Sequence, residues 1–216
     1  MLKNSTSAPL LPNGLLGESM GSLNVLVACE ESQEVTKAFR KLGHNAFSCD
    51  LQDCSGGKPE WHIKGDVIHQ LYNEWDLIIA HPPCTRLANS GVRWLAERDL
   101  WQDMYFACEL FNHFQSLGKM GVKVAIENPI PHKYAVEYIG KYSQIIQPWQ
   151  FGHPESKATC LWLYNLPELK PTNIVEGREQ KVWKMPPSSE RTKLRSKTYP
   201  GIAAAMAMQW GGNTFA

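Results

Sequence analysis

Short apolar runs alternate along the chain with segments of helical periodicity. Val35, Ala38, Phe39 and Leu42 recur at helical spacing, and Gly43 is a typical helix stop. Strands are expected at 23–30, 44–51, 76–81, 122–129, 143–151 and 159–166, and helices at 32–43, 93–117, 132–140 and 202–210, with a turn and short helix at 65–72 and a loop at 52–64. The alternation predicts an α/β fold, with a Rossmann-like, doubly wound, mostly parallel sheet. We expect a single domain at 22–216, preceded by a flexible leader at 1–21.

Polar residues close several of the expected strands. Ligands of such sheets bind beyond the carboxyl ends of the strands. The residues that should share this edge are Cys29, Glu30, Glu31, Ser32, Asp50, Cys84 and Glu127.

The stretch HPPC at 81–84 mounts a thiol on two rigid residues at the end of a buried run. A thiolate at Cys84 could add to carbon 6 of a pyrimidine, while Glu127 hydrogen-bonds N3 and the exocyclic amine, so that carbon 5 can accept a methyl group. A nearby positive charge or helix N-terminus favours the thiolate, and Arg86 and the helix after it are candidates. His81 either tunes Cys84 or is a packed or capping histidine.

The stretches HPPC and AIENP resemble the PPC and ENV motifs of DNA cytosine-5 methyltransferases, and FGHPESKAT at 151–159 resembles a third family segment. The chain also resembles the short methyltransferase-like proteins encoded by bacteriophages and prophages, and the resemblance implies a class I fold that uses S-adenosylmethionine. Cys84 would then be the nucleophile, and Glu127 would be the acid that hydrogen-bonds the target base. The cofactor would contact Cys29, Glu30, Glu31, Ser32, Asp50 at its ribose, Asp66 at its adenine amine, and Pro82. The substrate would contact Pro83, Asn128 and Lys157.

The family's glycine-rich cofactor turn is replaced here by ACEESQE at 28–34. Glu30 and Glu31 would then contact the positively charged amino-acid end of the cofactor.

Charge is concentrated in one segment of an otherwise balanced chain. The formal net charge is only +1, but 167–200 holds eight basic and four acidic residues. We interpret it as a basic loop insertion that binds DNA through Trp183, Lys193, Arg195 and Lys197, either a duplex with a flipped base or a single strand. A free pyrimidine nucleotide as substrate, and a non-catalytic nucleic-acid-binding scaffold, are the alternatives.

The six cysteines are dispersed and form no CxxC pair, which is typical of free thiols in a reducing compartment. Cys49, Cys54 and His62 match no common zinc spacing, so we expect no metal. No apolar run approaches the ~20 residues of a membrane span, and the N-terminus is a poor signal peptide. We therefore expect a cytoplasmic protein, in the bacterial host cell if it is encoded by a phage.

Overall fold

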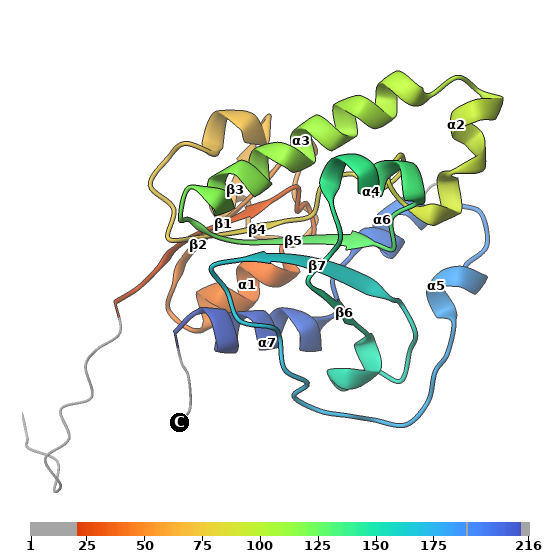
Figure 1. The fold of residues 1–216 in the computed structure, drawn as a ribbon. Helices are drawn as coiled ribbons and strands as arrows, with labels where there is room; N and C mark the ends of the chain where they lie inside the picture. The colour runs from red at the N-terminus through yellow and green to blue at the C-terminus, as the bar shows by residue number, and fades with distance from the viewer. Residues whose placement is uncertain (1–20, 189, 213–216) are drawn as a thin grey trace, which may run out of the picture.

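The computed structural model describes residues 21–188 and 190–212. A seven-stranded sheet in the order β3-β2-β1-β4-β5-β7-β6 forms the centre of the single α/β domain (Figure 1). Every strand is parallel to its neighbours except β7, which is antiparallel to β5 and β6. The predicted doubly wound, mostly parallel sheet is therefore confirmed. The strands are β1 Asn24–Ala28, β2 Asn45–Asp50, β3 His62–Lys64, β4 Leu77–Ala80, β5 Lys123–Pro129, β6 Gln144–Ile146 and β7 Thr159–Tyr164.

Helices cover both faces of the sheet (Figure 1). The helix α3 packs on one face, where Phe111 and Phe114 join the core, and α1 and α7 pack on the other, where Phe39 and Met206 do so. The central strands are covered on both sides, which explains why they are continuous apolar runs. The α-helices are α1 Glu34–Lys41, α2 Arg93–Glu97, α3 Trp101–Lys119, α4 Lys133–Ile139, α5 Lys181–Lys184, α6 Arg191–Ser196 and α7 Pro200–Trp210; the 3-10 helices are η1 Pro59–Trp61, η2 Val67–Gln70, η3 Asn89–Gly91 and η4 Pro148–Gln150.

The prediction of one long helix at 93–117 is wrong. The chain forms α2, leaves the helical path, and begins α3 at Trp101. Asp99 lies at the break with a left-handed φ of 49°, a conformation that no helix interior can contain. The apolar periodicity continues across the break, so the pattern alone does not reveal it.

Two other predicted boundaries change. The strand expected at 143–151 is only the three residues of β6, because Pro148 lacks a backbone N–H and begins η4 instead. The loop expected at 52–64 contains η1 and the edge strand β3, whose carboxyl end pairs with Asp50 through Lys64.

The segment 167–200 is more ordered than a long loop. It contains α5 and α6, and bridges join Asn173 to Phe151 and Glu179 to Glu155. The leader expected at 1–21 lies outside the described residues, apart from Gly21. Within the described ranges, none of the helices has both the length and the apolar character needed to cross a bilayer.

Candidate active site

The sheet reverses its direction of growth between β1 and β4. These strands lie side by side at the centre, with β2 and β3 on one side and β5 on the other. In doubly wound sheets this switch point opens a crevice beyond the carboxyl ends of the strands. The loop at 29–33 follows β1 and the HPPC loop follows β4, and the His81 amide bonds the Ala28 carbonyl at 2.9 Å. The structure thus brings the two expected loops together.

The HPPC loop is held by backbone contacts on both sides of the thiol. The Cys84 carbonyl accepts hydrogen bonds from the amides of Leu87 and Ala88, at 3.0 and 2.8 Å. Asn128 is buried and its Nδ2 donates to the Pro82 carbonyl at 2.9 Å. Asn128 therefore fixes the direction of the loop, a contact different from the substrate contact predicted for it. Pro82 is buried, whereas Pro83 is exposed and faces solvent.

Glu127 lies on β5, directly after the residue that pairs with the end of β4. Its Oε2 is 3.2 Å from Nδ1 of His81, and the two side chains are only 11% and 13% exposed. The Thr198 hydroxyl donates to the same oxygen at 3.5 Å. Burial would raise the pKa of Glu127, but the hydrogen bond and charge of His81, together with Lys157 and Thr198, lower it below its usual value. Glu127 is therefore ionised near neutral pH.

The Cys84 thiol is half-buried, and burial raises its pKa. The charges of Lys157 and Arg195 oppose that shift and favour the thiolate, whereas Glu127 adds to it. Arg86, which we predicted to favour the thiolate, is instead paired with Asp103 of α3 at 3.2 Å. The cations that act on the thiol come instead from distant segments.

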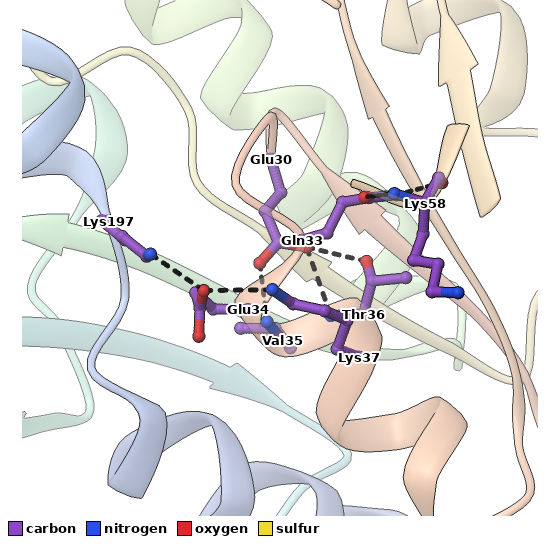
Figure 2. Close-up of polar contacts among 8 residues, drawn as sticks. All are labelled: Glu30, Gln33, Glu34, Val35, Thr36, Lys37, Lys58 and Lys197. Carbon is purple, nitrogen blue, oxygen red and sulfur yellow. Dashed lines mark hydrogen bonds and ion pairs between the residues drawn. The ribbon is translucent and has the colours of Figure 1, made fainter. Parts of the chain in front are cut away.

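The turn between β1 and α1 is shaped by Glu30. Figure 2 shows its carboxylate against the start of α1: Oε1 accepts from the Val35 amide at 2.7 Å, and Oε2 accepts from the amide and hydroxyl of Thr36, at 3.2 and 2.7 Å. Glu30 therefore caps the orphan N–H groups of the helix. Both carboxylate oxygens are used, so the predicted contact of Glu30 with a cofactor is replaced by a structural role.

The same turn is built without glycine. Cys29 and Gln33 take left-handed φ angles of 59° and 58°, the region that glycine normally occupies. The Gln33 side chain is held by the backbone of Lys58 through two hydrogen bonds, at 2.8 and 3.1 Å (Figure 2). The chain thus reaches a tight turn by bonding a side chain across to the next loop.

Three acidic groups lie beside this turn. Glu31 is buried, and its Oε2 has no hydrogen-bond partner within the described residues but lies 3.7 Å from Nζ of Lys193. Asp50 and Asp66 each use Oδ1 to hold their own turn, accepting from the amides of Gln52 and Ile68. Burial and the charges of Asp50, Cys49 and Asp66 raise the pKa of the Cys29 thiol to about 12, which places the two aspartates near the β1 turn. A buried carboxylate oxygen that accepts no hydrogen bond suits a ligand ammonium, and the aspartates suit ribose hydroxyls and an adenine amine. These residues fit S-adenosylmethionine.

Replacing Asp50 with alanine should weaken the binding of S-adenosylmethionine more than tenfold, about 1.4 kcal/mol, which is on the order of one charge-assisted hydrogen bond. Calorimetry measures the effect. Asp53→Ala is the matched control, because Asp53 lies in the same loop and pairs with Lys64 at the surface. Equal affinity of the Asp50→Ala variant and the wild type would remove Asp50 from the cofactor site.

The basic segment 167–200 contacts the acids of the β1–α1 region. Lys197 pairs with Glu34 at 3.0 Å, as Figure 2 shows, and Lys193 pairs with Glu31 at 3.7 Å. Lys157 Nζ donates to the Lys197 carbonyl at 3.3 Å. Predicted phosphate-binding lysines therefore contact the acids of the β1–α1 region in this structure. Trp183 is 76% exposed, so its ring is open to a stacking partner.

No group of three or more histidine, cysteine, aspartate or glutamate side chains that could hold a metal is found in the part of the chain that is described.

The sequence pattern left the role of His81 open, and the structure pairs it with Glu127. The feature of the sequence that singles out His81 is its place directly before Pro82, next to the Cys84 loop.

The chain was compared with protein-family models, curated proteins and solved structures. No family model and no curated protein matches the chain. Solved structures that it resembles include the Entamoeba histolytica methyltransferase EhMeth, at 14% identity and a TM-score of 0.45 over 74% of this chain and 57% of that one. They also include the S. pombe Dnmt2 methyltransferase, at 14% identity and a TM-score of 0.43 over 76% and 54%. The chain thus spans little more than half the length of either. Both of these proteins are named as methyltransferases.

Proposed function

We propose that the protein transfers a methyl group from S-adenosylmethionine to carbon 5 of cytosine in DNA, through a covalent adduct of Cys84. The observation that carries the proposal is the meeting of Cys84 and Glu127 at adjacent strand ends, with Lys157 and Arg195 as nearby cations. The Cys84 thiolate adds to carbon 6, and the added electron density makes carbon 5 nucleophilic. Glu127 hydrogen-bonds the ring edge and stabilises the adduct.

The β1 side of the crevice supports the choice of cofactor. Asp50 would hold the ribose, Asp66 the adenine amine, and Glu31 the ammonium of the methionine moiety. When bound, S-adenosylmethionine supplies an electrophilic methyl group. This chain's residues orient it beside the Cys84 loop and cover it with the basic segment.

DNA is the proposed substrate because cations gather around the thiol. Lys193 and Arg195 lie in α6, and Lys197 directly follows this helix. Lys193 and Lys197 contact Glu31 and Glu34 of the β1–α1 region. A cytosine reaching Cys84 must leave the base stack. The exposed ring of Trp183 favours single-stranded DNA as a second candidate substrate, because an aromatic face stacks on unpaired bases.

The test is the chemical identity of the product. The purified protein is incubated with methyl-labelled S-adenosylmethionine and with duplex DNA, single-stranded DNA or deoxycytidine nucleotides, and the products are digested to nucleosides for mass spectrometry. We expect labelled 5-methyldeoxycytidine from DNA and none with the Cys84→Ala variant. Label in another base, or only in the free nucleotide, would replace the proposed substrate. An absence of label with every substrate would favour the non-catalytic scaffold.

A further inference from the structure

We infer that His81 is a positioning residue that stores the proton which Glu127 delivers to N3 of the target base. The inference deepens the proposed function and rests on it. It starts from the pair itself: Nδ1 of His81 and Oε2 of Glu127 are 3.2 Å apart, and both side chains are almost withdrawn from solvent. A buried carboxylate and a buried imidazole at this distance share one proton.

The chemistry of cytosine requires such a proton. N3 of cytosine is a hydrogen-bond acceptor, and an ionised carboxylate is also only an acceptor, so the two repel unless a proton lies between them. Hydrogen bonds and charges from His81, Lys157 and Thr198 keep Glu127 ionised despite its burial. Glu127 therefore does not hold the proton by itself. The imidazole beside it is the group that can.

The surroundings of His81 favour its protonated form. Burial alone would lower its pKa, but Glu127 on β5 and Glu30 in the turn after β1 raise it above the usual value, against a smaller opposing effect of Lys157. The second ring nitrogen, Nε2, is buried and has no hydrogen-bond partner in the described part of the chain. The transferable proton is therefore the one on Nδ1, facing Glu127.

The Cys84 sulfur forms a bond to carbon 6, and the electron pair of the 5,6 double bond moves to form a double bond between carbons 4 and 5. The second electron pair of the bond between carbon 4 and N3 moves to N3, which takes a proton through the Glu127 carboxyl and leaves His81 neutral. Carbon 5 then gains the methyl group, S-adenosylhomocysteine leaves as the second product, and the proton of carbon 5 passes to water. The bond between sulfur and carbon 6 breaks, the thiolate leaves, and N3 returns its proton to the pair. S-adenosylmethionine is the only reactant consumed besides the base.

The first arm of the test does not depend on activity. The pKa of His81 is measured by NMR on histidine-labelled protein, with His81→Asn used for assignment. In the wild type we expect titration above the ordinary histidine value, and in Glu127→Gln a fall of about one unit or more, since an opposite charge is removed. A His81 pKa that is unchanged by Glu127→Gln would overturn the inference even if methylation is confirmed.

The second arm uses turnover. The wild-type kcat should depend on pH through two groups, because the active form needs a protonated His81 and an ionised Cys84, so the profile should have two limbs. His81→Gln should lower kcat about 10²-fold, remove one limb of the profile, and leave S-adenosylmethionine affinity unchanged. In a Glu127→Gln background it should have almost no further effect, because the two residues act as one unit. Additive losses, or both limbs retained in His81→Gln, would show a merely structural role.

Folding is checked separately. Circular dichroism and cofactor binding of His81→Gln should match the wild type; if that variant does not fold, His81→Asn takes its place in the same cycle. Absence of any methylation in the wild type would defeat the proposed function, while the NMR arm would still decide whether His81 and Glu127 share a proton.

Discussion

Wild-type protein incubated with S-adenosylmethionine and DNA that contains 5-fluorocytosine is expected to become covalently trapped on the DNA. In the proposed mechanism, the thiolate of Cys84 adds to carbon 6 and carbon 5 accepts the methyl group. The fluorine there cannot leave as a proton does, so the bond to sulfur cannot be broken again. The adduct survives denaturing electrophoresis and is measured as a shifted band, with the modified peptide identified by mass spectrometry.

The Cys84→Ala variant should give no adduct at all, since it lacks the nucleophile. Cys54→Ala is the matched control, because Cys54 is also a half-buried free thiol but lies in the loop between β2 and β3. It should trap as the wild type does. An adduct that forms with Cys84→Ala, or that maps to another cysteine, would contradict the assignment of the nucleophile.

Local patterns were sufficient to predict the central strands and the residues that follow them. The run Leu77–Ala80 is buried at every position, and a fully buried run followed by His81 and two prolines indicates a strand that ends there. Glu127 follows a similar run, so the parallel pairing of β4 and β5 places it near the HPPC loop without further information. This part of the site depends only on neighbouring residues and strand order.

Contacts between distant segments could not be predicted in the same way. Glu30 appeared to be a cofactor ligand because it closes a strand, but it caps α1 through amides that only the folded turn brings to it. Arg86 is close to Cys84 in the sequence, yet its guanidinium pairs with Asp103, seventeen positions along the chain. The cations that act on the thiol are Lys157 and Arg195, far along the chain. Sequence proximity is a poor guide to electrostatics because side chains find partners in space.

The pairing of the basic segment with acids of the β1–α1 region has a consequence for substrate binding. Lys193 and Lys197 contact Glu31 and Glu34 in this structure. DNA phosphates must compete with these carboxylates for the same ammonium groups. Phosphate binding would release Glu31 and Glu34 from the segment. Neutralising Glu34 by Glu34→Gln should therefore strengthen DNA binding by a small factor, about two- to threefold, because the lysine of the pair is half-exposed and solvent screens its charge.

Alanine at Lys193, Arg195 and Lys197 together should flatten the salt dependence of DNA binding by up to about three phosphate contacts. Each contact releases counterions, so the loss of three changes the slope by about 2.7. Between 50 and 200 mM salt the wild-type affinity should then fall roughly 40-fold more than that of the variant. Fluorescence anisotropy with labelled duplex and single-stranded oligonucleotides measures both slopes.

The control for this triple variant carries the same change of charge at the opposite end of the strands. Lys41, Lys119 and Lys123 are exposed and lie where α1 and α3 end and β5 begins. Their replacement by alanine should leave the salt dependence of DNA binding unchanged.

Trp183→Ala should weaken single-stranded binding more than duplex binding, because it removes a stacking face that only an unpaired base can use. The wild type and the triple variant could instead share one shallow salt dependence of DNA binding while a pyrimidine nucleotide is methylated. In that case the substrate is the free nucleotide, and the basic segment contacts the β1–α1 region without binding DNA.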